Sequence, residues 1–128
     1  MKVIISGSRT IDNKKYVCAV LDDSPYEITE LVSGHANGVD KLGEQWAIDK
    51  GIPIKIFSPH YSIDNPRIAP LLRNTDMSIY ADALIAVWDG NSKGTRHMIG
   101  EIVKTKKPCH VIVDGIQMTS ERKVDFVW

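Results

Sequence analysis

The chain has 128 residues, and its 16 lysine and arginine residues balance its 16 aspartate and glutamate residues. This length suits one compact domain over residues 1–128, and the neutral charge argues against nucleic acid as a partner. No apolar run approaches the roughly 20 residues that span a bilayer, and the apolar start breaks at a glycine too early for a signal peptide. We therefore expect a cytoplasmic protein with no membrane partner.

The first half of the chain repeats one pattern: an apolar, β-branched run, a loop of small or polar residues, and a segment with helical periodicity. Strands are predicted over 2–6, 28–32 and 52–57. Helices are predicted over 14–21 and from Val39 onward, where Gly51 ends the helix. The apolar stripe of the second helix follows helical spacing and consists of Val39, Leu42, Gly43, Trp46 and Ala47.

The second half resumes the pattern after a less regular segment that contains prolines. A helix is predicted over 67–80, although Pro70 could make it restart, and its apolar stripe is formed by Ile68, Leu71, Leu72 and Thr75. A strand over 83–88, a helix over 95–104 and a strand over 108–113 follow. The stripe of the 95–104 helix is Thr95, Met98, Ile99, Ile102 and Val103. The apolar end of the chain, Phe126, Val127 and Trp128, could form a last edge strand, finish the core or join an interface between subunits.

The strands read as continuous apolar runs and alternate with helices, which is typical of a parallel sheet covered on both faces. We predict an α/β protein: a Rossmann-like three-layer sandwich with a mostly parallel sheet of five or more strands. In such sheets the loops that leave the carboxyl ends of the strands share one edge, where ligands bind.

Three of these predicted loops are rich in small residues: 7–9, 33–38 and 89–95. Glycine lets a backbone turn sharply and lets its N–H groups approach a ligand. Each loop leads toward a helix N-terminus, whose free N–H groups favour an anion such as phosphate. Together the loops indicate a phosphate-bearing ligand.

Other chemistry is not indicated. GxGxxG and GxxxxGK[ST] are both absent, which argues against a dinucleotide dehydrogenase and a P-loop NTPase. Cys18 and Cys109 lie far apart and read as reduced, largely buried thiols. His60, His97 and His110 lack the spacing of metal ligands, so we expect neither a metal nor a cofactor.

An ordered set of motifs resembles the SLOG superfamily, named for the SMF/DprA and LOG proteins, and within it the YspA-like branch of bacterial and phage proteins. The motifs are GSR at 7–9, SGHANGVD at 33–40 before Trp46-Ala47, RN at 73–74 with Met77, and ADALIAVWDGNSKGT at 81–95. The resemblance implies a Rossmann-like domain that binds nucleotides or nucleotide-derived ligands, and a homo-oligomer. It also implies two further activities, because LOG proteins cleave the N-glycosidic bond of nucleoside monophosphates and DprA binds single-stranded DNA.

The chain departs from the LOG pattern PGGxGTxxE. No Pro-Gly-Gly precedes Gly94-Thr95, and Met98 stands where the resemblance would place the glutamate that takes part in hydrolysis. Glu101 lies one turn further along, well round from the apolar stripe of its helix, and is a poor substitute. If the chain is an enzyme, Asp40, Asp89 or Glu101 would have to supply the general acid or base.

The residues at the predicted ligand edge also have structural interpretations. Asp40 could accept a ribose hydroxyl or favour its helix N-terminus, and Thr95 could cap its helix or bind phosphate. Arg73 and Asn74 fall off the predicted stripe of their helix, which favours a role in the pocket. Trp88 could stack on a base, but the end of an apolar strand favours the core. We predict ligand contact for Gly7, Ser8, Arg9, Ser33, Gly34, His35, Gly38, Asp40, Arg73, Asn74, Asp89, Gly90, Ser92, Lys93, Gly94 and Thr95.

Three functional hypotheses follow. The leading one is a module that senses or sequesters a nucleotide-like small molecule, for example a signalling nucleotide, through glycine-rich loops. The alternative is an N-glycosidic hydrolase resembling the phosphoribohydrolases. The third is a DNA-processing accessory protein, which the neutral charge and the scarcity of aromatic residues place last.

Overall fold

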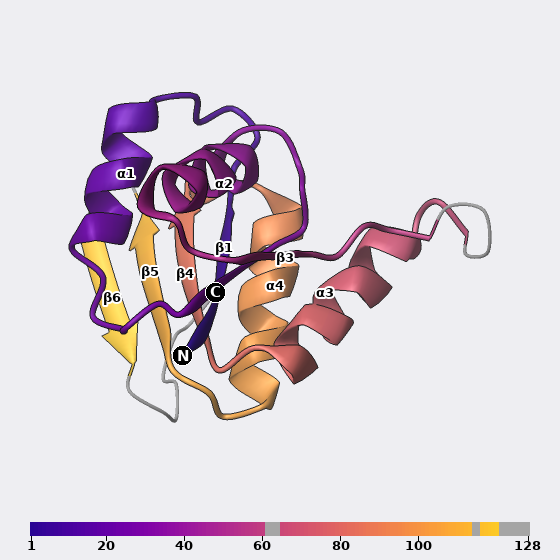
Figure 1. Cartoon of the computed structure of the whole chain (residues 1–128). Coiled ribbons are helices and arrows are strands. Elements are labelled where there is room, and N and C mark those ends of the chain that lie inside the picture. The colour runs from indigo at the N-terminus through magenta and orange to yellow at the C-terminus, as the bar shows by residue number, and fades with distance from the viewer. Residues whose placement is uncertain (61–64, 114–115, 121–128) are drawn as a thin grey trace.

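The computed structural model describes residues 1–60, 65–113 and 116–120 (Figure 1). Six strands form one sheet in the order β3-β2-β1-β4-β5-β6. The strands are β1 (Lys2–Gly7), β2 (Glu30–Ser33), β3 (Ile54–Ile56), β4 (Ala83–Trp88), β5 (Cys109–Val113) and β6 (Ile116–Ser120). The helices are α1 (Lys14–Asp22), α2 (Val39–Lys50), α3 (Ala69–Tyr80) and α4 (Lys93–Lys104).

The first five strands pair in parallel, and β6 pairs antiparallel with β5. The strands β2 and β3 lie on one side of β1, and the chain then crosses over so that β4 and β5 lie on the other side. The strand order therefore reverses between β1 and β4, and Rossmann-like sheets bind ligands at such a reversal point. The predicted fold class is confirmed.

The sheet separates two apolar clusters, because alternate residues of each strand point to opposite faces. Val3 and Ile5 pack with the buried faces of α1 and α2, whereas Ile4 packs with those of α3 and α4. Every residue of β4 is buried, as expected for a central strand covered on both faces. Figure 1 shows the helix pairs α1–α2 and α3–α4 on either side of the sheet.

The helix α2 follows its predicted pattern closely. Four residues of its expected stripe are buried, and Leu42 is partly buried. Gly51 adopts the left-handed conformation at φ 69° and ends the helix, with its N–H donating to the carbonyl of Ile48 at 3.2 Å. The indole of Trp46 donates to Asp22 at 2.8 Å and ties α2 to α1.

The predicted stripe of α3 is wrong. Ile68, Leu71 and Leu72 are 47%, 38% and 44% exposed, and the buried residues of the helix include Asn74 and Met77 instead. The reason is that α3 packs against α4 through polar partners. The Asn74 amide donates to the carbonyl of Gly94 at 3.4 Å and meets the His97 Nδ1 at 3.1 Å, and Thr75 donates to Glu101 at 2.6 Å.

Several element boundaries also differ from expectation. The helix α4 begins at Lys93 and is capped by Ser92, whose Oγ accepts the Thr95 N–H at 3.4 Å, so Thr95 lies inside the first turn and is not the cap. The strand β3 is shorter than the predicted 52–57. The last strand is β6, and residues 126–128 lie outside the described residues. Within the part of the chain that the structure describes, no helix is long and apolar enough to cross a membrane.

Candidate functional site

The three small-residue loops meet at the carboxyl edge of the sheet. The strand β1 lies between β2 and β4, so the loops that follow these three strands are neighbours. The Ser8 N–H donates to the Val87 carbonyl at 3.1 Å, and the Ser8 Oγ accepts the Asp89 N–H at 2.9 Å. These contacts bind the loop after β1 to the loop after β4.

Two glycines allow the loops to approach so closely. A Cβ on Gly7 would lie 2.2 Å from the carbonyl oxygen of Val87. Gly38 has a φ of +80°, and a Cβ there would lie 2.5 Å from the carbonyl oxygen of Ser8. Both positions therefore serve the packing of one loop against another.

The loop between β4 and α4 is held by its own polar groups. The Asp89 carboxylate accepts the N–H groups of Asn91 at 2.8 Å and Ser92 at 2.9 Å, and these hydrogen bonds hold the pKa of Asp89 below its usual value. The Trp88 indole donates to the Ser92 carbonyl at 3.0 Å from the buried end of β4. Asp89 thus shapes the loop, and Trp88 lies in the core.

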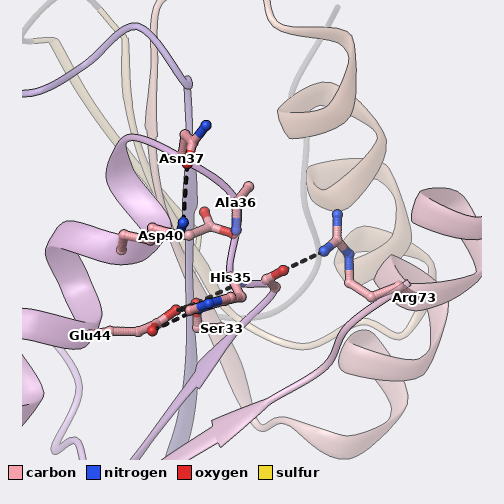
Figure 2. A network of polar contacts seen from close by, with 9 residues as sticks. Ser33, His35, Ala36, Asn37, Asp40, Glu44 and Arg73 are labelled. Atoms are coloured by element: carbon pink, nitrogen blue, oxygen red, sulfur yellow. Dashed lines mark hydrogen bonds and ion pairs between the residues drawn. The ribbon is translucent and has the colours of Figure 1, made fainter. Parts of the chain in front are cut away.

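The loop between β2 and α2 is held from two sides (Figure 2). On one side the buried carboxylate of Glu44 accepts the Ser33 hydroxyl at 2.7 Å and the His35 Nδ1–H at 2.9 Å. On the other side Arg73 of α3 donates to the Gly34 carbonyl at 2.5 Å. His35 has a φ of +60°, which turns its ring toward Glu44 and away from Arg73.

Asp40 is the one carboxylate of the predicted site that lines the cleft between these loops. It is 5% exposed, and its Oδ2 accepts the Ala36 N–H at 3.3 Å. Its Oδ1 is buried and has no hydrogen-bond partner among the described residues. Burial raises the pKa of the Asp40 carboxyl to about 7, against the opposing effects of the Ala36 amide, the Arg73 charge and the Gly7 amide, which lies near the carboxylate without a hydrogen bond of standard geometry to Oδ1.

The cleft has a volume of about 90 Å³ at the reversal point of the sheet. Eight of the predicted ligand residues line it: Gly7, Arg9, Asp40, Arg73, Asn74, Ser92, Gly94 and Thr95. The Arg9 side chain has no hydrogen bond or ion pair within the described residues, and a Cβ on Gly94 would meet nothing within 4 Å. The cleft therefore offers the exposed guanidinium of Arg9 and, at Gly94, a backbone segment that no side chain covers.

The remaining predicted residues lie away from the cleft lining. Gly34 is covered by the Arg73 side chain, and Ser8, Ser33 and Asp89 hold the loops together, while Gly90 and Lys93 lie in and after the loop that follows β4. His35 and Gly38 line a second, more open hollow of about 390 Å³ beside α2. Glu101 is 9% exposed, contrary to its expected place off the buried face, and it bonds Thr75 and Lys104 between α3 and α4.

The sequence reasoning missed five residues that line the cleft: Ser6, Ala36, Pro70, Leu71 and Met77. Ser6, Ala36 and Met77 belong to or adjoin the motifs already singled out, but none of them was predicted to contact the ligand. The first turn of α3 contributes Pro70 and Leu71, which carry no polar signature of a site. Within residues 1–60, 65–113 and 116–120 no group of three His, Cys, Asp or Glu residues could hold a metal ion.

Comparison with known proteins gives a family match over part of the chain and a similar solved structure. Residues 1–62 match the profile of the YspA, cpYpsA-related SLOG family, YAcAr. Among solved structures the chain is similar to DNA processing protein A (DprA) from Streptococcus pneumoniae, with 18% identity and a TM-score of 0.69 over 89% of this chain and 52% of that chain. At this identity the likeness shows the fold alone, and the chain spans about half the length of the DprA chain.

No curated protein sequence matches the chain significantly. The family match over residues 1–62 covers the motifs of the first two loops, and the fold of the rest continues the same Rossmann-like sheet. Residues 1–62 thus match a SLOG family, and the described chain as a whole has a Rossmann-like fold similar to that of DprA.

Proposed function

We propose that this chain binds a nucleotide or a nucleotide-derived ligand in the cleft between its three loops, and senses or sequesters it. The observation that carries the proposal is the composition of the cleft. Arg9, which has no partner among the described residues, the bare backbone at Gly94 and the buried acceptor on Asp40 line one small space. A phosphate needs a cation and free N–H groups, and a sugar hydroxyl needs a polar partner. The match of residues 1–62 to a SLOG family, a nucleotide-related group, supports the same conclusion.

The volume of the cleft limits which part of the ligand enters it. About 90 Å³ is well below the roughly 300–1,000 Å³ of sites that enclose a drug-sized molecule. The cleft therefore suits a phosphate and the adjoining sugar. The base would then lie outside the cleft, against the apolar lining residues Pro70 and Leu71. Both residues belong to the first turn of α3.

Cleavage of an N-glycosidic bond is the second candidate, and one observation favours it. A pKa of about 7 suits the Asp40 carboxyl to give or take a proton near neutral pH. Asp89 and Glu101, the other candidate acids, are engaged in hydrogen bonds outside the cleft lining. A DNA-processing role, which the name of DprA describes for that protein, ranks third because the chain is neutral overall.

The test is to denature natively purified protein, identify the released small molecules by mass spectrometry, and measure binding of ribonucleoside 5′-monophosphates by calorimetry. Recovery of an intact nucleotide supports sensing or sequestration, whereas free base with ribose phosphate supports hydrolysis. A steep salt dependence with single-stranded DNA would instead favour the third role.

Gly94→Asp is the matching variant. A side chain at this position meets open space, and a negative charge there opposes a phosphate, so binding should be lost while the melting temperature stays unchanged. Gly100→Asp is the control, because Gly100 lies on the same helix, also faces open space and does not line the cleft. Equal affinity in both variants would show that the ligand binds elsewhere.

A further inference from the structure

We propose that Asp40 binds a sugar hydroxyl of the ligand through its Oδ1, so that the cleft selects ribonucleotides over nucleotides whose sugar lacks that hydroxyl. This inference rests on the proposed function and names the class of nucleotide that the cleft accepts. Asp40 lines the cleft, is 5% exposed, and keeps an oxygen without a partner among the described residues. Buried polar groups of this kind are rare in native proteins, because leaving them unsatisfied costs free energy.

The chemistry of Oδ1 restricts what can satisfy it. A phosphate oxygen carries negative charge and only accepts hydrogen bonds, so beside a buried carboxyl it is repelled or depends on a single shared proton. A hydroxyl both donates and accepts, and it satisfies the Asp40 oxygen whether the carboxyl is ionised or protonated. The charges that face Asp40 are those of Arg73 and Glu44, and they oppose each other in their effect on the carboxyl.

The position of Asp40 separates a sugar from a base. A base edge such as that of guanine presents two N–H donors side by side, which pair best with both oxygens of one carboxylate. Here the Ala36 N–H already occupies Oδ2 at 3.3 Å and the Gly7 N–H lies near the carboxylate, so Oδ1 is the one oxygen without a hydrogen bond of standard geometry. Arg9 and Gly94 line the same cleft of about 90 Å³, so the group that meets Asp40 must be joined closely to the phosphate. In a nucleotide that group is the sugar.

The expected discrimination follows from the hydrogen bond that a hydroxyl gives to Oδ1, which is already buried and which a ligand without a hydroxyl leaves unsatisfied. That difference corresponds to about tenfold to a hundredfold in affinity. We therefore expect each ribonucleoside 5′-monophosphate to bind about tenfold to a hundredfold more tightly than its 2′,3′-dideoxy counterpart. The 2′-deoxy and 3′-deoxy compounds then identify which hydroxyl Asp40 binds.

The experiment measures the affinities of these compounds for three proteins by calorimetry: the unmodified chain, Asp40→Ala and Asp49→Asn. Asp40→Ala removes the partner of the hydroxyl, so its ratio of ribo to dideoxy affinity should fall to within about threefold. Asp49→Asn is the control, because Asp49 lies on the same helix, is exposed and does not line the cleft. It should keep the full ratio. A circular dichroism spectrum and a melting curve show that each variant is folded.

The outcomes are distinguishable. Ribonucleotides and dideoxynucleotides that bind the unmodified chain equally well would overturn the inference and leave the proposed function standing. Discrimination that persists in a folded Asp40→Ala variant would also overturn the inference, because another residue would then read the sugar. The absence of binding by every monophosphate would overturn the proposed function and the inference together.

Discussion

Asp40→Asn should stabilise the protein by an amount that grows with pH. Asparagine keeps the size of the side chain and an oxygen for the Ala36 N–H, but it carries no charge. Burial raises the pKa of Asp40 from its usual 3.8 to about 7, so the folded chain holds this proton over a range where the unfolded chain has lost it. The folded state binds more protons in that range, and the contribution of Asp40 to stability falls as the pH rises.

The magnitude follows from the width of the range. A shift of about three pH units corresponds to a loss on the order of 4 kcal/mol, complete above about pH 7 and absent below about pH 4. Asparagine avoids this loss. The free energy of unfolding of Asp40→Asn should therefore exceed that of the unmodified chain by a few kcal/mol at about pH 8 and by little at about pH 4.5.

Urea denaturation between about pH 4.5 and about pH 8 measures this difference directly. Burial lowers the pKa of His97 and of His110, so both histidines add their own pH dependence, but they are present in both proteins and cancel in the difference. Asp49→Asn on the surface of the same helix is the control and should give a small, nearly constant difference. A constant difference in Asp40→Asn as well would refute the raised pKa of Asp40.

Two further predictions concern packing. Gly38→Ala should destabilise the chain by about 2 kcal/mol or more in urea denaturation, because it adds a Cβ at φ +80° and 2.5 Å from the Ser8 carbonyl; a loss below about 0.5 kcal/mol would mean that the loops do not pack in this way. Burial raises the pKa of the Cys109 thiol to about 11, so a thiol reagent at about pH 8 should label the partly buried Cys18 quickly and Cys109 only after denaturation. Rapid labelling of both thiols in the folded chain would contradict the burial of β5.

The central strands of the sheet were predictable because they are covered on both faces. Such strands are mostly apolar, and the run from Ala83 to Trp88 shows this directly. The stripe of α2 was predictable for the same reason, since that helix lies over the sheet and its partners are apolar. The three loops followed from the strands, because parallel strands place their carboxyl ends on one edge.

The inner face of α3 was not predictable, because it depends on partners that are distant in the sequence. Asn74 is buried through contacts with Gly94 and His97, and Thr75 contacts Glu101. Helical periodicity assigns apolar residues to the core and cannot anticipate a polar contact between two helices. For the same reason the Glu44 carboxylate, which joins Ser33 to His35, has no signature in the sequence.

Asp40 is subject to two opposing effects: the helix N-terminus favours its charge, and burial disfavours it. Its place in the first turn of α2 indicated a favourable charge at a helix N-terminus, but its burial makes that charge unfavourable in the folded protein. An asparagine would satisfy the Ala36 N–H without this cost, so local stability does not explain an acid at this position. The two experiments on this residue therefore test different properties: Asp40→Asn should raise the free energy of unfolding at about pH 8, and Asp40→Ala should weaken the selection of the sugar. A lower free energy of unfolding in Asp40→Asn at about pH 8 would show that the carboxyl has a structural role, and unchanged selection in Asp40→Ala would show that its free oxygen is not a ligand site.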